Sequence, residues 1–179
     1  MKKCSVPIMG VLLIHAGLVA FGQSAPLRLP TCPAAQLSLA LDDENGYFNG
    51  MSHSGTLIVL RNLGPSVCTV PARPILGFEN ASHHPLPISI EISRGMHPGP
   101  VILPVAIPVA AEVTSQMRWV SSDAFGANNS VSPVFITLTV GGDILRMKFT
   151  GQLFGPANKQ PTYSVDFFKR DPAYAPAKP

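Results

Sequence analysis

The sequence predicts an all-β domain that follows a cleaved signal peptide. The expected fold is an Ig-like antiparallel β-sandwich with one disulfide. Of its 179 residues, 46% are hydrophobic and only 13% are charged, which is too apolar for a disordered chain and too sparsely charged for an ordinary soluble helical protein. Its 19 prolines and 15 glycines divide the chain into short segments. These segments alternate apolar and polar residues with the period of two of a half-buried strand. A small closed barrel is the structural alternative.

The N-terminus has the three parts of a secretory leader. A basic start, MKK, is followed by the apolar run Val6–Ala20, and Ala20 and Gly22 are small residues suited to signal peptidase. We therefore expect residues 1–22 to be a signal peptide. The apolar run is shorter than the ~20 residues of a membrane span, although a retained N-terminal anchor is the alternative. Cys4 precedes the run, so it would leave with the leader.

Charge narrows the range of partners. Loss of Lys2 and Lys3 with the leader lowers the net charge from +3 to +1. Nucleic-acid binding requires a clustered basic surface, so we expect no nucleic-acid partner. No second apolar run predicts a membrane span after leader cleavage. The protein is expected to be secreted, or to lie in the periplasm or cell envelope.

The first half of the domain contains four expected strands. Residues 23–31 read as a short linker, and the β-sandwich is expected over residues 32–168. A loop rich in acidic residues, Asn and Gly separates the first two strands, and the second is β-branched and stopped by the turn LGPS. The alternation implies one buried face and one wet face. The four segments are Ala35–Leu41, Thr56–Asn62, Pro74–Glu79 and Leu86–Ser93.

The second half begins with Pro98–Ala111, an apolar segment interrupted by proline every few residues. Because proline lacks the N–H that a ladder requires, this spacing excludes a helix and confines pairing to edges. The segment is either a buried crossing between sheets or an exposed apolar edge that binds a partner. Strands follow at Glu112–Val120 and, as a hairpin around the turn GGD, at Val134–Val140 and Ile144–Thr150. Tyr163–Phe168 is a last strand before a disordered tail at 169–179.

Two cysteines remain after leader cleavage, Cys32 and Cys68. An exported protein meets an oxidising compartment and two cysteines permit one intramolecular pairing, so we expect a disulfide that contributes roughly 2–4 kcal/mol. A catalytic thiol or a metal ligand is the alternative. A catalytic cysteine needs a nearby histidine base, and neither cysteine lies in a C-x-x-C or C-x-x-H arrangement.

The pattern of these residues resembles a known family. Cys32 precedes an apolar strand, a later strand ends in Asn62-x-Gly64, a second cysteine lies six residues past that Asn at Cys68, and a tryptophan strand follows at Trp119. This outline is similar to the secreted bacterial family called domain of unknown function 4232, from about Cys32 to Phe168. The resemblance implies a secreted β-sandwich with one disulfide and no established activity.

The chain departs from the family pattern in two ways. Ala72 stands where the family usually has glycine, and the downstream cysteines of some members are absent. By analogy with Ig-type sandwiches, we expect Trp119 to be the core tryptophan that packs on the disulfide.

Motifs for catalysis are missing from the sequence. It has no nucleophile elbow, phosphate-binding loop or dinucleotide fingerprint. Ser52 stands beside His53, but neighbours in sequence do not have the geometry of a catalytic triad. We therefore expect a protein that is not an enzyme.

Metal binding is the main alternative function. Imidazole and thioether groups suit exported copper handling, and all six candidates fall in expected loops. The sequence thus supports an exported, non-enzymatic binding or interaction module without a cofactor, whose partner is an unknown protein, glycan or envelope component. The alternative is a periplasmic copper-binding protein that uses these loop residues as ligands. If the protein does not bind copper, the histidines among them are unrelated surface residues. The candidate ligands are His53, His83, His84, His97, Met51 and Met96.

Overall fold

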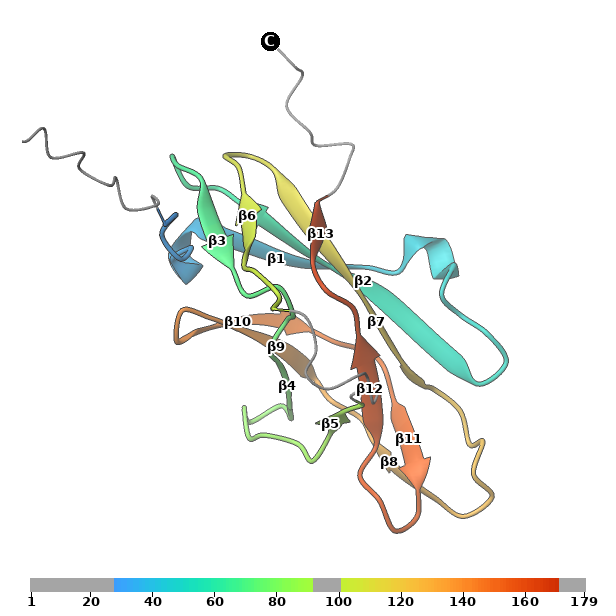
Figure 1. The fold of residues 1–179 in the computed structure, drawn as a ribbon. Helices are drawn as coiled ribbons and strands as arrows, with labels where there is room; N and C mark the ends of the chain where they lie inside the picture. The colour runs from blue at the N-terminus through green and yellow to red at the C-terminus, as the bar shows by residue number, and fades with distance from the viewer. Residues whose placement is uncertain (1–27, 92–100, 171–179) are drawn as a thin grey trace, which may run out of the picture.

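A computed structural model describes residues 28–91 and 101–170, and these form an all-β fold, as predicted (Figure 1). The largest sheet has the strand order β1-β2-β7-β12-β5, with β13 also paired to β7. A second sheet has the order β10-β9-β4, and β3–β6 and β8–β11 form two-stranded ribbons. Within the described ranges, the helical segments are two 3-10 turns, η1 (Ala34–Gln36) and η2 (Glu44–Gly46).

The strands of the described residues have the following bounds in chain order. The strands are β1 (Leu37–Asp42), β2 (His53–Asn62), β3 (Cys68–Val70), β4 (Leu76–Glu79), β5 (Ser89–Ile90), β6 (Val105–Ile107), β7 (Glu112–Val120), β8 (Asn128–Val131), β9 (Phe135–Val140), β10 (Asp143–Lys148), β11 (Leu153–Pro156), β12 (Thr162–Val165) and β13 (Lys169–Arg170). Every ladder is antiparallel except β5–β12, which is parallel.

The long strands β2 and β7 form the centre of the large sheet. They pair over their whole length, from His53 opposite Val120 to Arg61 opposite Glu112. Their inward side chains, such as Ile58, are buried in one core, whereas the alternate residues are more exposed. The alternation expected for Thr56–Asn62 and Glu112–Val120 is confirmed, because one face of this sheet is dry and the other is wet.

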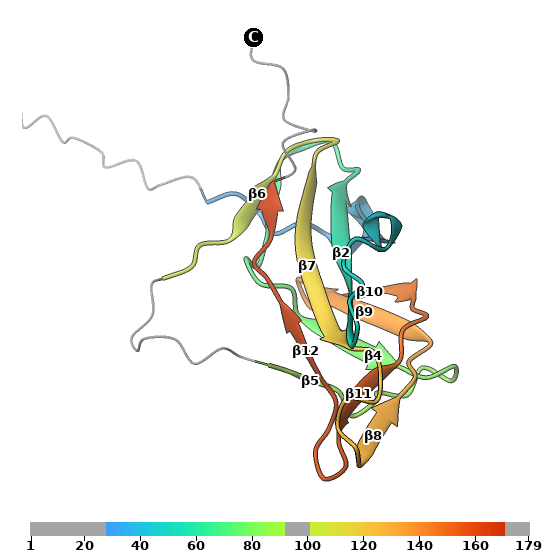
Figure 2. The ribbon, with the colours of Figure 1, turned by 90° about the vertical axis from the view of Figure 1, so that its right-hand side faces the viewer.

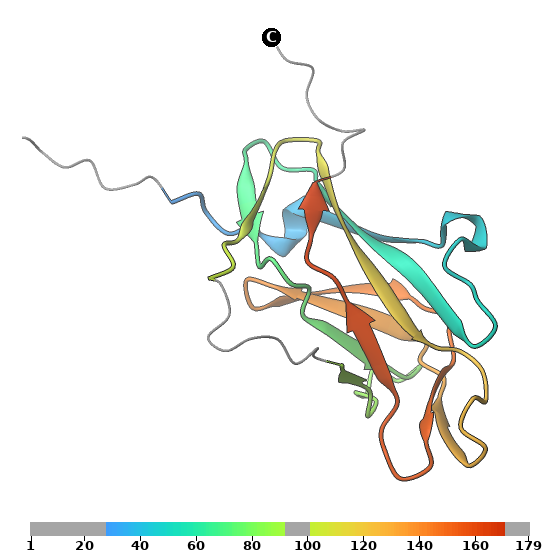
Figure 3. The ribbon, with the colours of Figure 1, turned by 45° about the vertical axis from the view of Figure 1, so that its right-hand side comes forward.

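The small sheet contains the predicted hairpin. Its two-residue turn is Gly141-Gly142, with φ of +61° and +94°, values that glycine adopts without strain and that match the twist of the flanking strands. The small sheet packs against the large one, as Figures 2 and 3 show. Aromatic rings join the two sheets, with centroids 5.3 Å apart for Phe78 and Tyr163. The Ig-like topology itself stays a prediction.

Several expected elements differ from those in the structure. Short β3, β8 and β11 lie outside the strands expected from the sequence, and β5 covers only two residues of Leu86–Ser93. Inside the proline-rich segment, β6 pairs with β3 between Pro104 and Pro108. It is an edge strand of this ribbon, as the proline spacing predicts. Val101 and Leu103, which precede β6, are exposed, whereas Ile107 at the end of β6 is buried.

The domain limits also change. Thr69 donates its backbone N–H to Pro30 O at 2.8 Å, and Thr31 forms a bridge to Thr69, so the end of the expected linker pairs with β3. At the other end, Lys169–Arg170 pairs with β7 instead of beginning a tail. The expected signal peptide lies outside the described residues. No helix of the described part of the chain is long and apolar enough to cross a membrane.

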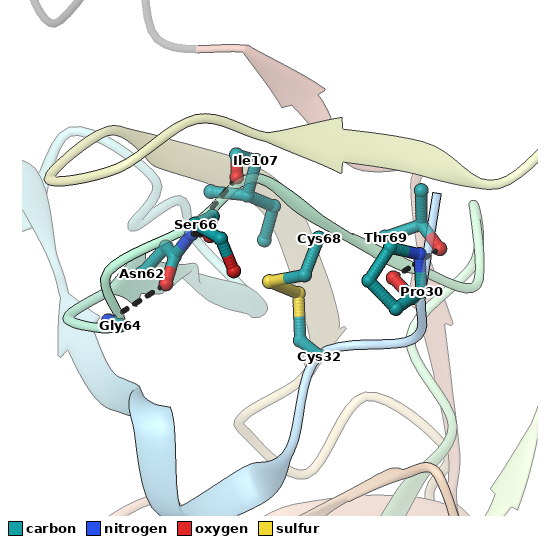
Figure 4. The surroundings of a disulfide bond; sticks show 8 residues. All are labelled: Pro30, Cys32, Asn62, Gly64, Ser66, Cys68, Thr69 and Ile107. Atoms are coloured by element: carbon teal, nitrogen blue, oxygen red, sulfur yellow. Dashed lines mark hydrogen bonds between the residues drawn. A yellow bond between two sulfur atoms is a disulfide. The ribbon is translucent and has the colours of Figure 1, made fainter. Parts of the chain in front are cut away.

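The predicted disulfide joins Cys32 and Cys68, both of which are buried (Figure 4). It covalently links the segment before η1 to β3, and Cys32 N also donates to Thr69 O at 2.9 Å. Because both sulfurs take part in this bond, neither cysteine is a free thiol or a metal ligand in this structure.

Asn62 explains the spacing of the motif that leads to Cys68. Its side chain is fully buried, and Nδ2 donates to Ser66 O at 2.8 Å and to Ile107 O at 3.0 Å. Its Oδ1 accepts from Gly64 N at 2.8 Å. One amide therefore shapes the loop from β2 to Cys68 and ties it to β6 (Figure 4). An apolar side chain at this position would remove all three hydrogen bonds and leave the N–H of Gly64 and the carbonyl of Ser66 without this partner.

Trp119 belongs to the core, as expected, but the expectation that it packs on the disulfide is wrong. Its ring packs edge-to-face on Phe149, with centroids 5.2 Å apart. The disulfide lies beside Ile107, which pairs with Cys68. Trp119 is near the far end of β7, so about 20 Å of extended strand separates it from that region. The Ig analogy misplaced it because here the tryptophan and the cysteines lie at opposite ends of the strands.

We expect the variant Asn62→Ala to lower the free energy of unfolding by about 3–5 kcal/mol, because it leaves buried backbone groups without hydrogen bonds. The control is Asn129→Ala, which removes a single exposed hydrogen bond to Lys159 O and should cost less than about 1 kcal/mol. Urea unfolding of the oxidised protein measures both. Equal losses in the two variants would contradict the role assigned to Asn62.

Candidate functional site

Three of the histidines proposed as copper ligands, His53, His83 and His84, lie in the described part of the chain, and none of them belongs to a group of metal-binding side chains there. His53 was expected in a loop, but it begins β2 opposite Val120, because the ladder with β7 extends three residues beyond the predicted strand. Its Nδ1 lies 3.1 Å from Ser52 Oγ, and Met51 is fully exposed. His97 and Met96 lie outside the described residues. Within 28–91 and 101–170, no three His, Cys, Asp or Glu side chains are placed to hold a metal ion.

His83 contributes to an ion-pair network instead. Its Nδ1 is 3.1 Å from Glu79 Oε2, and its ring lies on that of Phe135 with centroids 4.7 Å apart. Arg146 donates to the same carboxylate from Nε at 2.6 Å and from a terminal nitrogen at 3.0 Å. His84 is exposed, and its backbone N–H donates to Asn80 Oδ1. The network connects the turn after β4 to β10 across the small sheet.

The carboxyl of Glu79 is mostly buried, and its pKa is below the ordinary value. The hydrogen bonds from Arg146 are the largest cause, burial opposes them, and the hydrogen bond from His83 lowers the pKa further. A carboxyl whose pKa is lower in the folded state stabilises the fold at pH values above its unfolded pKa. That contribution is lost as the pH falls through the folded value.

We therefore expect Glu79→Gln to be less stable than the unchanged protein at pH 7 and to show a shallower loss of stability as the pH falls below about 4. Chemical unfolding at pH 7 and pH 3 measures this difference. Glu91→Gln is the control, since Glu91 is exposed and its carboxyl has no ion pair with another residue that the structure describes. Parallel pH profiles for Glu79→Gln and the unchanged protein would contradict the stabilising role of the network.

A cleft of about 620 Å³ lies between the edges of the two sheets. β1 is an edge of the large sheet and β10 is an edge of the small one. The β9–β10 turn lies against Thr31 and Cys32, so the two sheets meet near the disulfide. At the other end of β1 and β10, the cleft separates Asp42 from Lys148. It is lined by Leu41, Asp42, Asp43, Asn49, Ser54, Gly55, Thr56, Trp119, Lys148, Phe149, Thr150 and Gly151.

The cleft combines a rigid apolar base with polar walls. Trp119 and Phe149 are buried in the core and also line the cleft. Thr56 Oγ1 donates to Asp42 O at 3.0 Å, which ties β2 to the end of β1. The indole Nε1 of Trp119 is buried and has no hydrogen-bond partner among the described residues. A buried donor without an acceptor is rare and costly, and it marks this end of the fold as a place where polar contacts are incomplete.

A second cleft, of about 470 Å³, is also lined by Trp119. It contains three ionisable side chains of different types, His53, Glu91 and Arg118. Arg118 donates to Phe48 O at 3.3 Å and so holds the η2 loop against the sheet. The Ser52–His53 hydrogen bond joins neighbouring residues, and Ser52 does not line this cleft.

Gly55 lines the 620 Å³ cleft and permits close packing of the η2 loop. A Cβ at this position would lie 2.8 Å from Met117 O and 2.9 Å from Phe48 Cβ. Phe48, which the sequence places in a polar loop, is consequently buried against the end of β2. The absence of a side chain at Gly55 thus positions the loop that forms one rim of the cleft.

We expect Gly55→Ala to lower the free energy of unfolding by about 1–3 kcal/mol, because the new methyl group overlaps backbone as well as side-chain atoms. Thermal unfolding measures the change. Gly50→Ala is the matched control, because its Cβ would meet nothing closer than His53 O at 3.9 Å. If the alanine at position 55 were as harmless as the one at position 50, the packing of Phe48 on Gly55 would not constrain the loop.

The comparison with known families decides the identity of the domain. A model of the family described as Domain of unknown function (DUF4232) matches residues 32–160. The chain belongs to this family. The resemblance seen in the sequence is confirmed, and all residues that line the 620 Å³ cleft fall inside the matched range. Comparisons with curated proteins and with solved structures found no match.

Proposed function

We propose that this member of the DUF4232 family is an exported, non-enzymatic module that binds a polar partner in the cleft between β1 and β10. The partner is a protein, glycan or other envelope component. The observation that carries the proposal is the cleft itself, whose volume of about 620 Å³ falls in the range of ligand sites. Export is supported by the leader pattern and by a disulfide, which persists in oxidising compartments.

The side chains of the cleft favour binding over catalysis. Asp42 Oδ1 accepts from Glu44 N at 2.8 Å and Asp43 Oδ1 accepts from Asn45 N at 3.1 Å, so both carboxylates shape the η2 turn. Lys148 stands on the opposite side, at the end of β10. Charged and amide groups around an aromatic base provide orientation and specificity for a polar ligand.

The variant Thr150→Trp tests the proposal, because Thr150 is exposed and lines the cleft, so an indole there fills its mouth. The mature protein, recovered from an exporting host with an intact mass that lacks residues 1–22 and two hydrogens, is screened on a glycan array and against phage-displayed linear peptides. Any ligand that uses the cleft should bind Thr150→Trp at least tenfold more weakly.

Lys159→Trp is the matched control, since Lys159 is exposed and lies before β12, outside the cleft lining. It should leave the affinity unchanged. Ligands whose affinity is the same for Thr150→Trp and the unchanged protein would refute the cleft as the binding site. Chemical conversion of a bound ligand would refute the non-enzymatic assignment.

A further inference from the structure

We propose that the occupant of the cleft is an extended polypeptide segment of a second protein, which adds to β1 as a further strand. This inference rests on the proposed function and names the class of its ligand. It depends on the direction in which the backbone groups of β1 and β10 point, which the ladder registers determine.

The register of β1 directs the backbone groups of Leu39 and Leu41 away from β2, and Leu41 lines the cleft. Leu63 N donates to Gln36 O at 2.8 Å, so the bonded pairs with β2 continue at Ser38 and Ala40. In an antiparallel ladder the intervening residues direct N–H and C=O to the opposite side. The amide groups of Leu39 and Leu41 therefore point away from β2, and no described strand pairs with them.

The register of β10 likewise directs backbone groups away from its partner strand. Val140 and Asp143 close the two-residue turn, and Phe149 N donates to Val134 O at 2.9 Å, which fixes the phase of the β9–β10 ladder. The backbone groups of Arg146 and Lys148 therefore point away from β9. β1 and β10 are neighbours, but no ladder joins them in the described part of the chain. Unpaired strand edges thus border the gap that holds the cleft.

The outer edge of β6 is protected. Thr69 directs its N–H and C=O to Pro30 and Cys32, so Ala106 opposite it points outward from the β3–β6 ribbon. Its outward-facing neighbours in the same phase are Pro104 and Pro108, which have no N–H. Natural sheets block edges with proline in this way. The edge of β1 carries no proline in Leu37–Asp42, so it is competent to pair.

The chemistry of this edge selects a polypeptide over a glycan. Leu39 and Leu41 present alternating donors and acceptors at a repeat of about 6.8 Å, which a second β-strand matches bond for bond. Charged side chains beside the cleft also favour one type of side chain in the bound strand. Asp42 and Asp43 are exposed beside β1, and Lys148 is exposed beside β10. The incoming strand is therefore one that carries a basic side chain next to the Asp42–Asp43 pair.

The test uses a library of phage-displayed linear 12-residue peptides as the probe. The tightest selected peptide that loses binding to Thr150→Trp is synthesised with a single backbone N-methyl group at each position in turn. N-methylation removes an N–H and blocks one side of a strand, so we expect a loss of at least tenfold in affinity at alternate positions and little change between them.

Asp43→Asn tests the charge, because the amide oxygen can still accept from Asn45 N and keep the turn. Basic peptides should bind this variant several-fold more weakly, and the difference should shrink at high salt. Lys159→Gln is the charge control and should leave the affinity unchanged. Peptides without a basic residue, or equal affinity for Asp43→Asn, would overturn the assigned charge preference.

The outcomes separate this inference from the proposed function. If only a glycan shows Thr150→Trp-sensitive binding, strand addition is refuted and the cleft stands as a binding site. Selected peptides whose N-methyl scan shows no alternation also refute strand addition. If neither peptides nor glycans distinguish Thr150→Trp from Lys159→Trp, both proposals fail.

Discussion

The bond between Cys32 and Cys68, together with the buried amide of Asn62, is the constraint on which the arrangement of the sheets depends. The disulfide spans 36 residues of sequence, so in the chain-entropy model it stabilises the fold by about 3–4 kcal/mol. That is a large fraction of the roughly 5–15 kcal/mol of a typical domain. Asn62 adds specificity, because its three hydrogen bonds define one loop conformation that brings Cys68 to Cys32.

This constraint closes one end of the fold and leaves the other open. Near the disulfide, the β9–β10 turn lies against Cys32, so the two sheets are held together there. At the far end, the sheets are joined by aromatic contacts such as Trp119 on Phe149, with the cleft beside them. An opening between two sheet edges is what a β-sandwich retains when its edge strands are not joined by hydrogen bonds. The ligand site proposed here follows from that incomplete closure.

The sequence predicted those features that depend on local pattern. Alternation located β2 and β7 because their inward residues repeat every second position over a long run, and Gly141-Gly142 located the hairpin turn because few other residues accept its backbone angles. The disulfide followed from the number of cysteines in a chain that was expected to be exported. Short strands such as β3 and β8 were missed because three or four residues carry too little periodicity.

Features that depend on contacts between distant segments could not be predicted. The cleft is formed by β1, β2, β7 and the segment after β10, so no single stretch of sequence marks it. The copper hypothesis relied on residue types alone, and the structure engages His83 with Glu79, while His53 is part of a ladder. Trp119 was placed by analogy with another fold, which fixes its burial but not its neighbours. Gly55 and Phe48 show no pattern in the sequence that would connect them.

The central claim is that the edge of β1 facing β10 is unpaired. Amide hydrogen exchange measured by NMR on the oxidised, ligand-free protein tests it residue by residue. The account predicts fast exchange for Leu39 and Leu41, whose N–H groups point toward the gap, and slow exchange for Ser38 and Ala40, which are bonded to β2. Equal protection of all four amides would show that the edge is already closed, and would contradict both the open cleft and the strand addition proposed for it.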